Sequence, residues 1–194
     1  MNQKETVICP WVTGGDKVYV NYHNEEWGRP IYDSKLLFEK LCLDGQQAGL
    51  SWLTILKKRQ GYLDAFCQFQ PEKIIELSQA YRDDLMNNAN IVRNKLKINS
   101  IYKNANAYMI MENEGINFSE FLWGFVGGSP VQNTYKTSDE VPTENHMSVA
   151  MSKALKKRGF NFVGPTICYA FMEAVGMFNN HLTTCHYHQE CLNT

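Results

Sequence analysis

Cysteine and histidine residues near both ends of the 194-residue chain are the side chains that most clearly suggest chemistry. Cys9 and His23 lie near the start, and His181 and Cys185 lie near the end. The second pair is four residues apart, so one helical turn can point both side chains at the same ion. Two thiolates and two imidazoles would form a closed tetrahedral zinc shell with no position for a reacting water.

The spacing alone does not decide whether these four residues bind a metal. Single Cys and His residues are common, and these four match no short zinc-finger pattern. His186, His188 and Cys191 follow directly, so the pattern does not fix which residues form the C-terminal pair of ligands. If zinc binds, a closed shell predicts a structural role, in which the ion joins two chain ends that would otherwise fray.

A second group of chemically capable side chains lies between residues 11 and 52, which contain three of the four tryptophans. Large aromatic faces can hold a base that has been turned out of a nucleic acid, and they hold a cationic base best through cation–π attraction. Core packing is the more common role for any one aromatic side chain. The residues concerned are Trp11, Tyr19, Tyr22, Trp27 and Trp52.

Asp44 is the carboxylate that accompanies these aromatics. It lies between Leu43 and Gly45, after an apolar stretch, where a merely solvated carboxylate is not expected. The alternative is that Asp44 caps the start of the next helix. Gly45 and Gly49 suggest that the backbone approaches another group closely here.

Residues 81–87, 88–92 and the segment from Arg93 onward are typical of a helix, a tight turn and a second helix. Such a hairpin can present backbone N–H groups to a phosphate. An ordinary helical corner is the alternative, and periodicity alone favours it. Two basic clusters, 57–59 and 156–158, could flank a DNA backbone, although such clusters are usually solvated helix ends.

The elements that must position these residues are helical. Apolar residues three and four positions apart, together with capping residues and prolines, predict helices that begin near residues 34, 51, 71, 98, 118, 149 and 165. Residues 127–145 are polar and predict a surface loop. We therefore expect an all-α protein that forms one domain over residues 1–194, with two lobes that share a core.

Bulk composition is ordinary for a soluble globular protein, with 44% hydrophobic and 20% charged residues. There is no apolar run that resembles a signal peptide or a membrane span, so we expect a cytoplasmic monomer. The net charge of −1 predicts that any DNA contact uses a local basic patch and backbone amides.

Three longer motifs closely resemble the 3-methyladenine DNA glycosylase I family: 22–28 (YHNEEWG), 45–52 (GQQAGLSW) and 156–164 (KKRGFNFVG). The similarity covers nearly the whole chain, over residues 9–185. The resemblance implies a two-lobed helix-hairpin-helix DNA glycosylase fold, and double-stranded DNA that contains alkylated adenine as the partner, with no membrane or protein partner.

Because the similarity covers nearly the whole chain, the family's functional positions can be assigned residue by residue along it. The resemblance implies that zinc is held by Cys9, His23, His181 and Cys185, that Trp11, Tyr19, Trp27 and Trp52 bind the base, and that Asp44 and Tyr22 are catalytic. It also implies that Gly49 and Leu50 fill the gap left by the flipped base. The hairpin corresponds to residues 88–93, with Asn90 and Arg93 at the DNA.

Two positions depart from the family pattern. The family usually has Glu at the position of Asp44, whose carboxylate reaches about 1.5 Å less. Either the backbone shifts, a water bridges the gap, or recognition of the base weakens. The hairpin usually has Gly at the position of Asn90, and Asn is the residue other than Gly that best tolerates a positive φ, so we expect the turn to form.

The resemblance implies that the protein flips out 3-methyladenine and releases it by hydrolysis. The sequence shows no lysine placed by a motif to form a Schiff base, so we expect no strand cleavage. One alternative is a damage-binding module whose catalytic activity is weakened because Asp44 replaces the usual Glu. A zinc nucleobase deaminase is the other alternative, because residues 23–25 match H-x-E, although the P-C-x-x-C half of that signature is absent.

Overall fold

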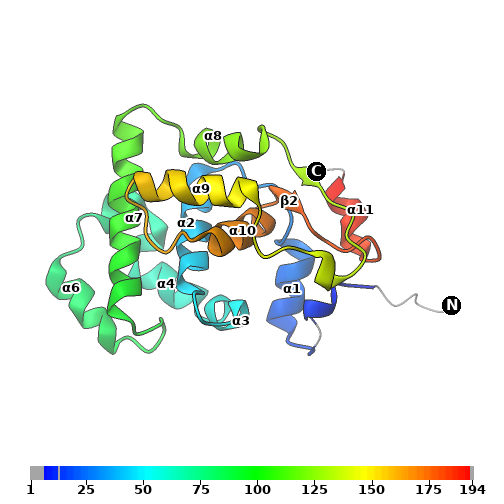
Figure 1. Ribbon diagram of the computed structural model, residues 1–194. Helices are drawn as coiled ribbons and strands as arrows, with labels where there is room; N and C mark the ends of the chain where they lie inside the picture. The colour runs from blue at the N-terminus through cyan, green and yellow to red at the C-terminus, as the bar shows by residue number, and fades with distance from the viewer. Residues whose placement is uncertain (1–6, 13, 193–194) are drawn as a thin grey trace.

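The computed structural model describes residues 7–12 and 14–192, and these residues are mostly helical, as predicted (Figure 1). The α-helices are α1 (Lys17–Glu25), α2 (Ser34–Gln46), α3 (Trp52–Leu56), α4 (Arg59–Ala65), α5 (Pro71–Ile74), α6 (Gln79–Asp84), α7 (Lys95–Asn113), α8 (Phe118–Trp123), α9 (His146–Lys157), α10 (Pro165–Ala174) and α11 (His186–Leu192). Short 3₁₀ turns are η1 (Pro10–Val12), η2 (Cys67–Phe69), η3 (Leu85–Asn87), η4 (Gly124–Val126) and η5 (Ser138–Glu140). In the described part of the chain, no helix is both long and apolar enough to cross a membrane.

Helix α2 lies at the centre of the molecule and packs against α3, α7, α8 and α10 (Figure 1). Its N-terminus is capped by Asp33, whose carboxylate accepts hydrogen bonds from the backbone N–H groups of Lys35 and Leu36. Leu37 and Leu41, one turn apart, are fully buried. The apolar stripe that predicted this helix is therefore the stripe that it buries in the core.

The predicted helical hairpin is formed by α6, η3, a turn over residues 88–94 and α7. Helix α7 begins at Lys95, between the starts expected at Arg93 and near residue 98, because Asn94 caps it by accepting from the N–H groups of Leu96 and Lys97. The turn forms as expected, but Asn90 does not adopt a positive φ. Instead, the backbone N–H of Asn90 donates to the side chain of Asn88 at 2.9 Å.

Residues 127–145 were expected to be a surface loop, and they contain a short strand as well. Strand β1 (Val131–Gln132) pairs in parallel with β2 (Phe178–Asn179), which lies directly after α10. Strand β2 is buried, whereas β1 is partly exposed. Two residues are too few for a periodic pattern, so this pairing left no signal in the sequence.

Helices α1 and α11, from opposite ends of the chain, lie on the same side of the molecule (Figure 1). The contact is direct, because the sulfur of Cys185, just before α11, lies 3.7 Å from Nε2 of His23 on α1. The chain ends therefore meet, as the Cys and His residues predicted.

Candidate active site and metal centre

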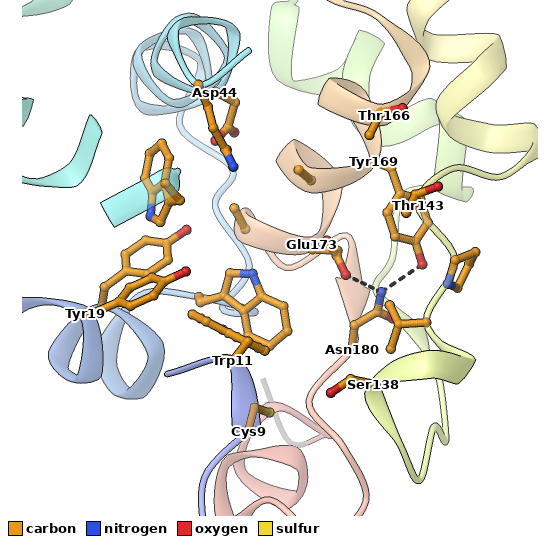
Figure 2. A pocket seen from close by; sticks show the side chains of 18 of the residues that line it. Cys9, Trp11, Tyr19, Asp44, Ser138, Thr143, Thr166, Tyr169, Glu173 and Asn180 are labelled. Carbon is orange, nitrogen blue, oxygen red and sulfur yellow. Dashed lines mark hydrogen bonds between the residues drawn. The ribbon is translucent and has the colours of Figure 1, made fainter. Parts of the chain in front are cut away.

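A cavity of about 390 Å³ opens between η1, α1, α2, α3, α10 and residues 138–143 (Figure 2). All six residues predicted to bind or act on a base line it, although they come from four separate elements and one loop. They are Trp11, Tyr19, Tyr22, Trp27, Asp44 and Trp52. The volume falls in the usual range for a small-molecule pocket, so the cavity is a suitable binding site for one planar ring system.

The aromatic residues form two contacting groups around this cavity. The ring of Trp11 lies 5.1 Å from that of Tyr19 and 5.0 Å from that of Trp27. The rings of Tyr22 and Trp52 are 5.4 Å apart and inclined at 47°. Burial raises the pKa of Tyr22 well above its ordinary value, so its hydroxyl stays protonated at neutral pH.

Asp44 lies inside α2, so the alternative that it caps the following helix is wrong; Ser51 caps α3 instead. Its side chain is 2% exposed and forms an ion pair with Lys40, one turn earlier on the same helix. Burial raises the pKa of Asp44, and the ammonium of Lys40 acts in the opposite direction. The expected close approach is confirmed at Gly45, where a Cβ would lie 3.1 Å from the carbonyl oxygen of Phe162, and is wrong at Gly49, where a Cβ would meet no atom within 4 Å.

Lys40 is a pocket residue that the sequence analysis did not identify. Its side chain is 11% exposed, and its Nζ lies 3.9 Å from the centre of the Trp52 ring and 5.9 Å from that of Tyr22. Burial lowers the pKa of Lys40, whereas Asp44 raises it. The signal that could have revealed Lys40 is its i,i+4 spacing from Asp44, which pairs opposite charges on one helix face.

Glu173 on α10 is a second carboxylate that the sequence analysis missed. Its side chain accepts a hydrogen bond of 2.8 Å from the amide of Asn180, which also donates to the hydroxyl of Tyr169 at 2.9 Å (Figure 2). Burial raises the pKa of Glu173 to about 7. An acidic residue within the otherwise apolar run of 167–175 was the available signal.

The predicted DNA-binding residues lie outside the cavity and are exposed. Gly49 and Leu50 belong to the loop that joins α2 to α3, and Leu50 is 42% exposed. Gly49 has a φ of +73°, a conformation that favours glycine. Asn90 and Arg93 lie in the turn before α7.

The wedge loop, residues 47–51, and the hairpin turn, residues 88–94, are connected through Lys97 at the start of α7. The ammonium of Lys97 donates to the backbone carbonyls of Gln46 and Ala48, both at 2.7 Å. It thereby satisfies carbonyl groups at the C-terminal end of α2. The two segments that the resemblance assigns to DNA are thus held in a defined relation to each other.

The basic cluster at 57–59 makes contacts within the protein. Lys57 pairs with Asp16 at 2.5 Å, and Lys58 donates to the carbonyl of Ala89 at 2.6 Å. Arg59 pairs with Glu26 through two hydrogen bonds. In the second cluster Arg158 pairs with Glu114. These partners show that both clusters also serve to join elements of the fold.

Four buried residues, Cys9, His23, His181 and Cys185, form a cluster whose ligand atoms all lie within 4.8 Å of one another. Cys185 Sγ lies 3.7 Å from His23 Nε2 and 3.6 Å from His181 Nδ1, and Cys9 Sγ lies 3.7 Å from His181 Nδ1. Ligand atoms around a tetrahedral zinc ion are separated by about 3.6 Å, given the usual bond lengths. Three of the separations match this value, so the cluster could hold a metal ion.

The outer ring nitrogens of the two histidines are fixed by other groups. His23 Nδ1 lies 2.7 Å from the side-chain oxygen of Asn24, and His181 Nε2 lies 3.1 Å from the carbonyl oxygen of Trp27. Such contacts orient metal-binding imidazoles. Hydrogen bonds to Cys185 lower its pKa, which favours the thiolate that binds metal.

The other candidate ligands near the C-terminus have different neighbours. His186 pairs with Glu190 at 3.0 Å, and His188 Nε2 lies 2.9 Å from the carbonyl oxygen of Asn133. Among the described residues, the converging group is the four-residue cluster, and Cys191 is not part of it. The ligand set implied by the resemblance is therefore the one that the structure brings together.

The cluster and the cavity share a wall. The ring of Trp27 lies 4.6 Å from that of His181, and the ring of Trp11 lies 5.2 Å from that of His23. Both tryptophans also line the cavity. Anything that loosens the cluster therefore acts on two aromatic side chains of the pocket.

An aromatic cavity with a buried carboxylate, in a helical chain with two exposed turns beside it, is the arrangement of a protein that binds a planar, hydrogen-bonding ring. A family model described as methyladenine glycosylase matches residues 11–188, and the chain belongs to this family.

The relatives are similar over most of their length. The chain is 51% identical to the DNA-3-methyladenine glycosylase of Haemophilus influenzae, over 93% of this chain and 97% of that protein. It is 49% identical to DNA-3-methyladenine glycosylase 1 of Escherichia coli, over 91% and 94% of the two chains.

Solved structures of relatives have the same fold as this chain. A crystal structure of 3-methyladenine DNA glycosylase I matches with a TM-score of 0.91 at 47% identity, covering 93% of this chain and 98% of the other. A variant of 3-methyladenine DNA glycosylase I in complex with 3-methyladenine matches with a TM-score of 0.85 at 42% identity, covering 89% and 93%.

Proposed function

We propose that this protein is a base-excision repair glycosylase that flips 3-methyladenine out of alkylated double-stranded DNA and releases it by hydrolysis. The observation that carries the proposal is the convergence of all six predicted base-pocket residues on one cavity of about 390 Å³. Support comes from the relatives named for this activity and from the related structure in complex with 3-methyladenine.

The pocket suits a flat ring that carries positive charge. Tyr22 and Trp52 offer aromatic faces to a base, and the carboxylate of Asp44 offers an acceptor to its edge. Methylation at N3 makes adenine cationic, which weakens its bond to the sugar, so the enzyme has no need to protonate the base. Neutral adenine lacks the cation–π and carboxylate interactions and is held less tightly.

Tyr22 orients the base as a neutral phenol, and water attacks the sugar carbon once the base has been drawn into the cavity. The expectation of a monofunctional enzyme stands although Lys40 lies in the pocket. Its nitrogen is ion-paired with Asp44 and lies over the ring of Trp52, so both contacts hold it against the wall of the pocket.

The exposed turns are proposed to hold the DNA. Leu50, at the tip of the wedge loop, would fill the space that the flipped nucleotide leaves, and Gly49 gives that loop its turn. The hairpin turn with Asn90 and Arg93 would contact the phosphate backbone. The protein would act as a monomer inside the cell, where its DNA substrate lies.

We also propose that the cluster of Cys9, His23, His181 and Cys185 binds one zinc ion. Two sulfur and two nitrogen donors at tetrahedral spacing fit zinc, and a complete set of four protein ligands makes the site structural. When bound, the ion would clip the chain ends together. This closed shell also opposes the deaminase alternative, and Glu25 of the H-x-E match is exposed.

The test is the release of free 3-methyladenine from methylated duplex DNA, detected by chromatography. Asp44→Asn should lower single-turnover excision by about 10- to 200-fold, the value of one charge-assisted hydrogen bond. Asp44→Glu asks whether the shorter side chain limits the enzyme. Glu39→Gln, which changes a half-buried carboxylate on the same helix, is the control and should retain activity.

One observation favours the alternative of a damage-binding module. Asp44 is already ion-paired with Lys40 and is shorter than the usual Glu, so the carboxylate reaches the base less readily. Tight binding of methylated or abasic DNA without release of base would favour the module. If Asp44→Asn excises the base as fast as the wild-type protein does, Asp44 does not have the proposed role.

A further inference from the structure

Lys40 occupies the position in the pocket that a bound cation would favour. Its ammonium is ion-paired with Asp44 and lies 3.9 Å from the centre of the Trp52 ring. These two groups are the same ones that a cationic base would use, one for charge and one for stacking. The side chain is only 11% exposed, so this arrangement is built into the wall of the cavity.

Two buried polar atoms beside Lys40 have no hydrogen-bond partner among the described residues. They are Oδ2 of Asp44, an acceptor, and Nε1 of Trp52, a donor. Buried polar groups are normally paired, because an unpaired one costs free energy. Both residues line the cavity, so a ligand that displaces the ammonium of Lys40 can supply the missing partners, while Oδ1 of Asp44 is already held by Lys40.

The charge balance of the pocket follows from these contacts. With Lys40 protonated and Asp44 ionised, the pair has no net charge, so it gives a cationic base little attraction. A cation that enters the cavity is also brought close to the ammonium, which repels it. If Lys40 loses its proton, the pair becomes negative and attracts the cation.

We propose that Lys40 is a specificity-determining residue whose ammonium competes with a cationic base for Asp44 and for the face of Trp52, so that the base binds as Lys40 releases its proton to solvent. This inference rests on the proposed function, because it concerns the same base pocket. It makes the affinity for a cationic base increase with pH until Lys40 is neutral.

The groups that act on the charge of Lys40 come from four helices. Asp44 and Glu39 lie on α2, Tyr22 on α1 and Glu26 directly after it, Arg59 on α4 and Glu173 on α10. Arg59 is neutralised by its bidentate pair with Glu26. Burial lowers the pKa of Lys40, and Asp44 is the main group that raises it. The pKa of Glu173 is about 7, so its titration must be separated from that of Lys40.

The experiment measures binding of the 3,9-dimethyladeninium ion, in which a methyl group takes the place of the sugar and the ring stays cationic near neutral pH. Calorimetry of the full-length protein, in two buffers of different ionisation enthalpy, gives both affinity and protons released. For the wild type, affinity should rise with pH until Lys40 is neutral, and binding of the ion should release protons over the same range, measured at about pH 7, pH 8 and pH 9.

Two substitutions of Lys40 separate charge from packing. Lys40→Met removes the ammonium but keeps a long apolar chain beside Trp52, and at about pH 7 it should bind the ion at least about tenfold more tightly than the wild type. Lys40→Arg keeps a charge that cannot be lost, so it should bind weakly at every pH and release no proton. Lys40→Gln serves in place of Lys40→Met if that variant does not fold by circular dichroism.

Glu173→Gln is the matched control for the second titrating carboxylate, and it should release as many protons as the wild type does above about pH 8, where Glu173 is already ionised. The inference is overturned if Lys40→Met binds the ion no more tightly than the wild type, or if the wild type binds it without releasing a proton. A protein that neither binds the ion nor excises 3-methyladenine would instead overturn the proposed function, and this inference with it.

Discussion

The Cys–His cluster and the base pocket adjoin each other, yet their polar groups are arranged in opposite ways. In the cluster, both histidines have their outer nitrogens held by Asn24 and Trp27, and their inner nitrogens face thiols. In the pocket, Asp44 and Trp52 each have a buried polar atom without a partner among the described residues. The cluster has the donor groups of a complete metal site, whereas the pocket keeps polar atoms unpaired, as we propose for a site that binds its ligand reversibly.

This difference distinguishes the Cys–His cluster, which can stabilise the fold, from the base pocket, which the rest of the fold must stabilise. A closed set of four ligands contributes free energy to folding when metal binds. Buried carboxylates and a buried lysine cost free energy that the rest of the structure must supply. The two regions meet at Trp11 and Trp27, so the Cys–His cluster directly supports the base pocket.

The largest effect is expected from breaking the cluster. Cys185→Ala removes one of the four ligands and should abolish the binding of one zinc per chain. It should lower the free energy of unfolding by at least about 3 kcal/mol more than Cys191→Ala does, because metal binding is linked to folding. Elemental analysis and urea unfolding measure the two quantities.

Cys191 is a suitable control because it is also buried, at 2% exposure, near the C-terminus and outside the cluster. A chelator should lower the stability of the wild type and of Cys191→Ala but leave Cys185→Ala unchanged. Equal metal content in the two cysteine variants would contradict the assigned ligand set.

A smaller effect is expected from Glu173, which tests whether the pocket is costly to fold. The pKa of a glutamate in an unfolded chain is about 4.3, whereas the pKa of Glu173 in the folded protein is about 7. Between these values the folded state binds more protons than the unfolded state, so the free energy of unfolding falls as pH rises. Above about pH 7 this contribution is constant.

Glu173→Gln removes the titration and keeps the size of the side chain. The wild type should lose about 3 kcal/mol more than this variant between about pH 4 and about pH 8, measured by urea unfolding. If the free energy of unfolding depends on pH in the same way in the two proteins, burial of Glu173 does not lower stability. The contrast between the cluster and the pocket would then weaken.

The outcome at Lys40 and Glu173 also shows what could be read from the sequence. Capping residues and apolar spacing predicted α2, α3 and α10, because those signals are local. Helix α1 was not predicted, since its nine residues are mainly polar and aromatic, although Asp16 caps it. Lys40 and Glu173 were missed because a charged residue on a helix is normally solvated, and only packing against other helices buries it.

Asp44 shows the same limit from the other direction. Its spacing allowed either a cap or a pocket residue, and only the resemblance favoured the pocket. The four Cys and His residues were equally ambiguous against His186, His188 and Cys191, because ligand choice depends on where distant segments meet. The resemblance to the family identified the six pocket residues, whereas the network around them depends on three-dimensional packing.

The smallest effect is expected at the rim of the pocket, where neither metal nor buried charge is involved. Leu50 is 42% exposed at the tip of the wedge loop and contributes little to the core. Leu50→Ala should change the free energy of unfolding by less than about 0.5 kcal/mol. It should nevertheless slow excision from duplex DNA by about tenfold, because the space left by the flipped base is no longer filled.

The control for Leu50 is Leu36→Ala, since Leu36 is similarly exposed, at 53%, but lies at the start of α2 away from the wedge loop. It should leave excision unchanged. Single-stranded methylated DNA gives the sharper comparison, because no base pair has to be opened and Leu50→Ala should then match the wild type. An equal loss of excision rate on both substrates would show that Leu50 shapes the pocket itself. The base pocket would then extend outward to the wedge loop.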